Sequence, residues 1–256
     1  MIIISQYPIL EFDQERTAKI EPSQVIKPRD VPEHAVLCFF RDVIESVVAE
    51  HQGRIIVENR WEDGPHPLYE IEYEGQRLAF CHPGVGSALS AGILEEVIAF
   101  GCRKFMVCGG CGVLEAEIQL GGLVVVNAAV RDEGASYHYL PPAREVSANA
   151  EAVAALQATL QAHRVPYRLA KTWTTDAPYR ETQARINLRR ADGCQVVEME
   201  AAALMAVAQF RGVRLGQLLY GGDDLSGEVW DHRSWQSRTD VRQNMFWLAA
   251  EACLKL

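Results

Sequence analysis

The sequence lacks several features that define large classes of protein. It has no run of about 18 apolar residues, the length that a membrane-spanning helix needs. Polar residues follow residues 1–4 at once, so the apolar core of a signal peptide is missing too. Lysines and arginines are dispersed, which argues against a surface that binds nucleic acid. We therefore expect no membrane and no nucleic-acid partner, and a small-molecule ligand instead.

Cysteine is too sparse for a disulfide-stabilised protein. Seven cysteines, an odd number, are spread over 256 residues, which is typical of reduced thiols in a cytosolic protein. Cys108 and Cys111 form a C-x-x-C motif, but no second cysteine pair and no H-x-x-x-H accompany it. Zinc needs two further ligands with such spacing, so we expect no metal and a cytoplasmic location.

The composition itself is that of an ordinary globular chain. A length of 256 residues with 48% hydrophobic composition allows one large core, so we expect a single domain over residues 1–256. The formal net charge of -9 and the pI near 5.3 are moderate. Residues 1–30 contain Pro8, Pro22 and Pro28 among acidic breaks and are predicted to form an irregular N-terminal arm.

Apolar runs and helical periodicities alternate along the rest of the chain. Strands are predicted at 78–81, 105–108, 123–130, 168–173, 195–197 and 215–220. Helices are predicted in a mixed stretch around 35–51, between Ser87 as N-cap and Gly101, at 150–163, at 201–210 before Gly212, and at 241–254. This alternation predicts an α/β fold, a three-layer αβα sandwich with a central mixed, mostly parallel sheet. Ligands bind such sheets outside the carboxyl ends of the strands.

The first unusual segment after a predicted strand is rich in glycine. Cys108, Gly109, Gly110, Cys111 and Gly112 follow one another and are predicted to form a turn. Three glycines let the backbone approach a ligand and expose its N–H groups as an anion nest. The alternative is a tight turn with two small buried thiols.

Two glutamates, Glu198 and Glu200, stand on either side of Met199 at the end of a predicted strand. We expect at most one of them to enter a given pocket. A carboxylate that accepts two hydrogen bonds suits a vicinal diol such as that of ribose. The alternative is that both complement the dipole of the following helix.

Two further segments could carry chemistry. Asp223 and Asp224 follow two glycines and an apolar strand, and adjacent acids raise each other's pKa, which helps one of them hold a proton near neutrality. A solvated turn is the alternative. In the segment 174–180, Tyr179 could stack on a base or pack against the core.

Taken together, these segments resemble a known family. Residues 197–203 are similar to the ribose-binding signature of the nucleoside phosphorylase superfamily, which includes purine nucleoside and uridine phosphorylases. Residues 131–139 resemble another segment of that family. The turn 84–86, the glycines 109–112 and the pair 175–176 fall in the expected order. The resemblance covers roughly residues 68–256.

The resemblance implies a role for each matching residue. Glu200 matches the glutamate that holds the 2′- and 3′-hydroxyls of ribose, and Met199 matches the residue that packs under the sugar. Asp223 matches the aspartate that protonates the base nitrogen in purine-specific members. Arg238 falls where those enzymes keep an arginine that assists this acid.

The base site departs from the family pattern. Pro178 stands where the usual stacking aromatic is found, and Tyr179 follows it, so Tyr179 and Asp176 are the expected base-binding residues. Uridine-specific members keep a glutamine and an arginine just beyond that aromatic. Thr182 and Ala184 stand at those positions, which favours a purine over uracil.

The phosphate site departs further. The family's N-terminal glycine-aspartate-proline loop with an arginine is not found, and neither is its N-terminal histidine near the 5′ end of the sugar. An arginine and a serine or threonine of the family are replaced by Val107 and Gly110. The expected phosphate-binding residues are Gly109, Gly110, Cys111 and Arg60, with Arg41 as an alternative cation.

The resemblance implies an enzyme, a pentosyltransferase that uses inorganic phosphate as co-substrate and no other cofactor. It would release a free base and ribose 1-phosphate through an oxocarbenium-like transition state. Two alternatives stay open: a nucleoside hydrolase that uses water, and a non-catalytic protein that binds or stores nucleosides. Family members are usually oligomers that complete each site with a neighbour's residues, so a homo-oligomer is expected, either a dimer or a hexamer.

Overall fold

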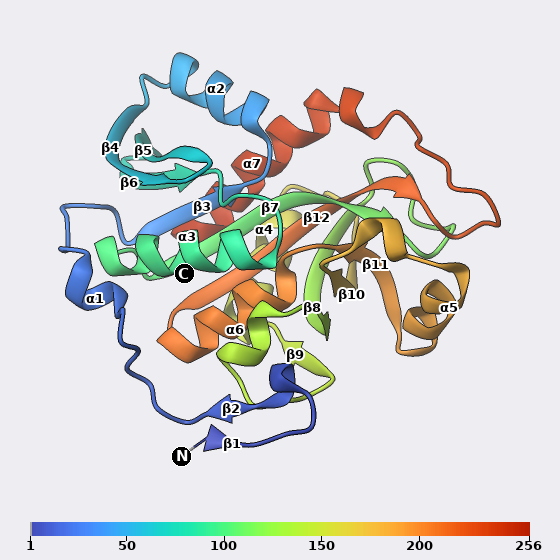
Figure 1. Ribbon diagram of the computed structural model, residues 1–256. Helices are drawn as coiled ribbons and strands as arrows, with labels where there is room; N and C mark the ends of the chain where they lie inside the picture. Colours follow the sequence, from blue (N-terminus) through green and yellow to red (C-terminus); the bar gives the residue numbers. More distant parts are fainter. Residues whose placement is uncertain (1) are drawn as a thin grey trace.

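The computed structural model describes residues 2–256. One large ten-stranded sheet forms its centre, and helices cover both faces of this sheet (Figure 1). Neighbouring strands follow the order β11, β10, β8, β12, β7, β3, β6, β5 and β4, with β9 paired to β8 outside this order. Parallel and antiparallel pairings both occur, so the predicted α/β class with a central mixed sheet is confirmed.

The bounds of the strands show where the sheet lies in the sequence. They are β3 (His34–Cys38), β4 (Arg54–Trp61), β5 (Gly64–Tyr73), β6 (Gln76–Cys81), β7 (Lys104–Val113), β8 (Leu123–Asp132), β9 (Glu145–Ser147), β10 (Tyr167–Thr175), β11 (Cys194–Glu198) and β12 (Arg214–Asp224). Within this sheet, Val113 pairs with Val196 on β11 and with Asp224 on β12. The carboxyl ends of β7, β11 and β12 therefore meet, and the strands between them close into a ring.

Helices pack on the two faces through apolar stripes. On one face, α3 (Ser87–Phe100) and α6 (Ala201–Arg211) bury residues such as Leu94 and Leu204 against the sheet. On the other face, α2 (Arg41–Glu50), α4 (Ala150–Ala162) and α7 (Thr239–Leu254) bury residues such as Leu156 and Phe246. These two cores make the three layers that the alternating pattern predicts.

The structure corrects the predicted elements in the first third of the chain. The stretch 35–51, expected to be mixed helix, divides into strand β3 and helix α2. Residues Ala35 to Cys38 are all buried, so the strand shows no alternation that would distinguish it from a buried helix. The hairpin of β4 and β5 was not predicted, and neither was α5 (Gln183–Ala191), in which Ile186 and Arg189 alone are buried.

The predicted glycine turn is wrong. Residues 109–112 continue strand β7, and Gly109 and Gly110 pair with Leu219 and Tyr220 on β12. The glycines are needed because bulky side chains lie against them. A Cβ on Gly112 would approach Leu225 Cδ1 to 2.6 Å, and one on Gly109 would approach Phe39 Cδ2 to 3.1 Å.

Two of the three predicted helix caps are confirmed. Gly101 ends α3 with φ of 144°, and Gly212 ends α6 in the left-handed region with φ of 71°. Ser87, expected to be the N-cap of α3, is instead its first helical residue, and Gly86 takes the cap position. The Ser87 hydroxyl donates to the Met199 carbonyl at 2.6 Å, which ties the start of α3 to the start of α6.

The N-terminal arm carries short elements. Strands β1 (Ile2–Ile3) and β2 (Phe12–Asp13) form a small separate sheet, and η1 (Pro8–Leu10) and α1 (Pro22–Val25) are each one turn long. In Figure 1 the arm runs along the outside of the layers. Its elements β2 and η1 contact the turn η2 (Ala135–His138). Over residues 2–256, none of the helices has the length and apolar character to cross a bilayer.

Candidate active site

A cavity of about 320 Å³ lies where the strands β7, β11 and β12 end. Its wall includes the predicted residues Met199, Glu200 and Asp223, together with Gly109 to Cys111 of β7. The chain segments that follow β3, β6 and β10 also reach it. Glu200 and Asp223 thus face one cavity, although they lie 23 positions apart in the sequence.

The two glutamates at the end of β11 have different surroundings. Glu198 is buried, and its Oε1 accepts hydrogen bonds from the hydroxyls of Thr172 and Thr174. Its Oε2 accepts from the backbone N–H groups of Glu200 and Ala201, at 2.7 and 2.6 Å. All four donors belong to the protein, so Glu198 fixes the start of α6, as expected of an acid at a helix N-terminus.

Glu200 is left with capacity for a ligand. Its side chain lines the cavity, and Oε1 accepts one hydrogen bond from the Gly86 N–H at 2.7 Å. Burial raises the pKa of Glu200 to about 8, and the nearby Glu198 carboxylate adds to this effect. The lone pairs of Glu200 that the Gly86 N–H leaves free can accept from two adjacent hydroxyls of a ligand.

Asp223 is held by an indole. Its Oδ2 accepts a hydrogen bond from Trp230 Nε1 at 2.7 Å, and its side chain lines the cavity. The neighbouring Asp224 forms an ion pair with Arg233 and accepts from the Ser226 N–H. Burial acts to raise the pKa of Asp224, but these bonds outweigh it and the pKa is lowered. Of the two adjacent acids, Asp224 is therefore occupied by Arg233 and Ser226, and only Asp223 lines the cavity.

The two predicted cationic residues lie elsewhere. The Arg238 guanidinium donates to Asp240, with both N···O distances at 3.2 Å, and makes no hydrogen bond to Asp223. Arg60 is exposed on β4 and lies 3.7 Å from Glu58. Among residues 2–256, the lining of the cavity includes no lysine, arginine or histidine.

The predicted base-binding residues lie at the margin of the cavity. Pro178 lines it, whereas Tyr179 is 99% exposed. Tyr179 borders an adjoining cavity of about 450 Å³ that shares Pro178, Glu181 and Asp223 with the first. Asp176 is exposed, and its Oδ2 accepts from the Gly134 N–H at 2.8 Å.

Cys111 has no nucleophilic character. Burial raises the pKa of its thiol well above the usual value, and the thiol donates to the Tyr220 carbonyl at 3.2 Å. The buried-thiol alternative therefore describes Cys108 and Cys111, although the backbone that carries them is a strand and not a turn.

Several residues that line the cavity are not among the predicted site residues. Phe39 and Phe40 follow β3, a strand that the prediction missed. Glu181 carries no motif, yet burial and the charge of Asp223 raise its pKa to about 7. Gln217 was visible as a lone polar residue in the apolar run 215–220, and it lines the cavity from β12.

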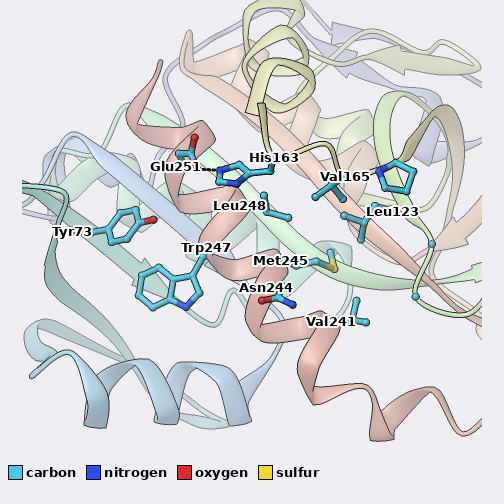
Figure 2. Close-up of a pocket in the computed structure, with 13 residues that line it drawn as sticks. Tyr73, Leu123, His163, Val165, Val241, Asn244, Met245, Trp247, Leu248 and Glu251 are labelled. Carbon is cyan, nitrogen blue, oxygen red and sulfur yellow. Dashed lines mark hydrogen bonds and ion pairs between the residues drawn. The ribbon is translucent and has the colours of Figure 1, made fainter. Parts of the chain in front are cut away.

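A larger cavity of about 540 Å³ lies along α7 (Figure 2). Apolar side chains such as Leu123, Met245 and Leu248 dominate it, and an ion pair between His163 and Glu251 lies at one edge. None of the predicted site residues lines it, so the cavity at the strand ends is the candidate active site.

Comparison with known proteins gives the class to which this arrangement belongs. The profile of the Phosphorylase superfamily matches residues 34–254. The chain is 26% identical to guanosine phosphorylase of Halorubrum lacusprofundi over 65% of this chain and 67% of that one. It is 28% identical to purine nucleoside phosphorylase of Plasmodium vivax over 73% and 78% of the two chains.

Solved structures share the fold. Uridine phosphorylase from Vibrio fischeri superposes with a TM-score of 0.76 at 20% identity, covering 95% of this chain and 100% of that one. AMP nucleosidase from Bacteroides thetaiotaomicron gives a TM-score of 0.70 at 21% identity, covering 87% of each chain.

The chain belongs to the phosphorylase superfamily, as the resemblance implied. The curated relatives are named nucleoside phosphorylases, which are pentosyltransferases, and this chain is a member of the same enzyme family.

Proposed function

We propose that the protein cleaves the N-glycosidic bond of a ribonucleoside. One observation carries this proposal: the carboxyl groups of Glu200 and Asp223 line the same cavity at the strand ends. A sugar held at Glu200 places its base toward Asp223, so one molecule can engage both acids.

The two acids have separate tasks in this reaction. Glu200 accepts hydrogen bonds from the ribose 2′- and 3′-hydroxyls through its free lone pairs. As the C–N bond lengthens, positive charge develops on the sugar and negative charge on the base. Asp223 donates a proton to the base nitrogen as the bond breaks, which makes the base a better leaving group. The Trp230 N–H keeps the Asp223 carboxyl group in place.

For the base, we propose a purine, since Thr182 and Ala184 replace the residues of uridine-specific members. One observation favours a pyrimidine as second candidate. Counted from Tyr179 instead of Pro178, the glutamine and arginine positions fall on Gln183 and Arg185, and Gln183 lines the adjoining cavity. A panel of purine and pyrimidine ribonucleosides decides between them by the ratio of their kcat/KM values.

For the nucleophile, we propose inorganic phosphate, which the relationship to nucleoside phosphorylases supports. Hydrolysis is the second candidate, and the lining of the cavity favours it. Four acidic residues, Glu181, Glu198, Glu200 and Asp223, line the cavity, and no basic residue is among its lining residues. An anion is disfavoured in such surroundings, whereas water is not.

Product analysis tests the whole proposal. The enzyme is incubated with a purine ribonucleoside, with and without phosphate, and free base, ribose and ribose 1-phosphate are quantified. Release that depends on phosphate and yields ribose 1-phosphate supports phosphorolysis. Release of ribose at the same rate without phosphate supports hydrolysis. Binding of nucleosides without any turnover across the panel would favour the storage protein and reject the proposal.

We also propose that the protein acts in the cytoplasm as a homo-oligomer, a dimer or a hexamer. Partner residues would then bring positive charge to the cavity, which its own lining residues lack. Light scattering combined with size-exclusion chromatography measures the mass, and a monomer of 28.5 kDa would contradict this proposal.

A further inference from the structure

Gln217 is a buried polar residue without a partner. It lies on β12 between Gly216 and Leu218, and its side chain is 1% exposed. Neither Nε2 nor Oε1 has a hydrogen-bond partner within the described chain. Buried amides are almost always paired, because an unpaired donor or acceptor loses its bonds to water without replacement. An amide with both atoms unpaired is therefore a sign of a missing ligand.

The position of Gln217 shows where that ligand lies. Gln217 lines the same cavity as Glu200 and Asp223. Leu219, two residues along the strand, also lines it, and successive odd residues of a strand share one face. Phe39 and Gly109 border this part of the cavity, so Gln217 is the polar group of an otherwise apolar region.

The chemistry of a primary amide defines what it binds. Nε2 donates and Oε1 accepts, so the ligand must offer both a lone pair and an O–H group. Water meets this requirement, and so does hydrogenphosphate. We propose that Gln217 binds the oxygen nucleophile of the reaction and holds it near the anomeric carbon. This inference rests on the proposed cleavage of nucleosides.

The reaction balances with either nucleophile. The C–N bond breaks with its electron pair going to the base nitrogen, which receives the proton of Asp223. The oxygen bound at Gln217 forms the new bond to the anomeric carbon. Hydrogenphosphate attacks through an unprotonated oxygen and yields ribose 1-phosphate, and its remaining proton replaces the proton that Asp223 gave up. Water yields ribose and loses one proton, which replaces the proton that Asp223 gave up.

The substitution Gln217→Leu tests this role, because leucine has a similar size and no polar atoms. Gln195→Leu is the matched control, since Gln195 is also on a strand with an unpaired buried oxygen but does not line the cavity. We expect Gln217→Leu to lower kcat/KM about ten-fold or more, as for a lost hydrogen bond to the reacting group. The melting temperature should be unchanged or higher, because an unpaired amide is removed.

A second measurement separates positioning of the nucleophile from a structural effect. If the wild type needs phosphate, Gln217→Leu should raise KM for phosphate more than KM for the nucleoside. If it hydrolyses, a water and methanol mixture gives ribose and methyl riboside, and Gln217→Leu should change their ratio. Should Gln217→Leu fail to fold, Gln217→Met is used for the same assays.

Each outcome is decisive. A rate for Gln217→Leu within about two-fold of Gln195→Leu overturns the inference, since a ligand-binding amide contributes more than that. A slower variant with unchanged KM for phosphate, or with an unchanged product ratio, overturns it as well. Absence of any base release by the wild type rejects the proposed function itself, which is a different result.

Discussion

The two sides of the cavity differ in what they offer a ligand. At the ends of β11 and β12, the carboxyl groups of Glu200 and Asp223 face the interior and have lone pairs to spare. At the ends of β3 and β7, the lining is Phe39, Phe40 and glycine. The comparison indicates that the chain retains groups suited to a sugar and a leaving base, whereas its own side chains supply no positive charge for an anion.

The largest expected effect on activity comes from Asp223. Asp223→Asn removes the donated proton but keeps the shape and the contact to Trp230. We expect kcat/KM on purine ribonucleosides to fall about 10²- to 10⁴-fold, the range for a lost general acid. Steady-state kinetics measure this, with Asp63→Asn at the tip of the β4–β5 hairpin as control. Near-normal activity of Asp223→Asn would remove this residue from the acid role.

Substitution of Glu198 should lower the stability of the fold, whereas substitution of Glu200 should lower activity. Glu198→Ala removes the carboxyl group to which four buried donors bond, so we expect the free energy of unfolding to fall by about 3 kcal/mol. Denaturant unfolding measures this. Glu115→Gln is the control, because its ion pair with Arg190 is partly exposed and is worth at most about 1 kcal/mol. Equal losses in the two variants would contradict the assignment of Glu198 to the start of α6.

Glu200→Gln should act on the substrate instead. We expect kcat/KM to fall about 10- to 100-fold on ribonucleosides, because the glutamine NH₂ group can only donate, whereas the carboxyl oxygen that it replaces can accept from a ribose hydroxyl. The loss should be smaller on 2′-deoxyribonucleosides, which present one hydroxyl fewer. An equal loss on both substrates would show that Glu200 does not contact the 2′-hydroxyl.

Much of the fold could be predicted because its signals are local. Helix α3 ends at Gly101 and α6 at Gly212, and each glycine adopts a positive φ that its own position in the chain requires. The ring closure between β7 and β11 could not be predicted, because it depends on the pairing of Val113 with Val196 across 83 positions (196 − 113). The glycines of β7 were misread for the same reason, since the side chains that lie against them come from distant segments.

The residues of the site also divide into those that could be predicted from the sequence and those that could not. Glu200 and Asp223 follow strands, and the carboxyl ends of strands meet, so their convergence on one cavity follows from the pattern. Glu181 lies in an irregular segment between η3 (Pro178–Arg180) and α5. Such a segment has no sequence periodicity from which the direction of a side chain could be predicted. Its contact with the cavity depends on packing alone.

The acidic side of the cavity should also make stability depend on pH. Glu200 has a pKa of about 8 and Glu181 of about 7, both above the ordinary value of 4.5. The folded chain therefore binds more protons than the unfolded chain between pH 4.5 and pH 8. From these groups, the free energy of unfolding should be highest below pH 4.5 and fall as the pH rises through 7 and 8.

Denaturant unfolding across this pH range measures how steeply the free energy of unfolding falls with pH. Glu200→Gln and Glu181→Gln should each flatten this slope. Glu115→Gln, where neither the residue nor its partner Arg190 lines the cavity, should leave the slope as it is in the wild type. A slope that persists unchanged in Glu200→Gln would show that this group titrates alike in the folded and unfolded chains.

The smallest effect is expected at Arg238, where the resemblance and the structure point in different directions. The resemblance implies that Arg238 assists Asp223, but Asp240, two residues away, accepts both of its hydrogen bonds, and Trp230 holds Asp223. We therefore expect Arg238→Gln to change kcat/KM by about two-fold at most, as for an exposed ion pair. A fall as large as that of Asp223→Asn would mean that Arg238 leaves Asp240 when the nucleoside binds, because only a guanidinium that reaches the acid or the base can affect proton donation.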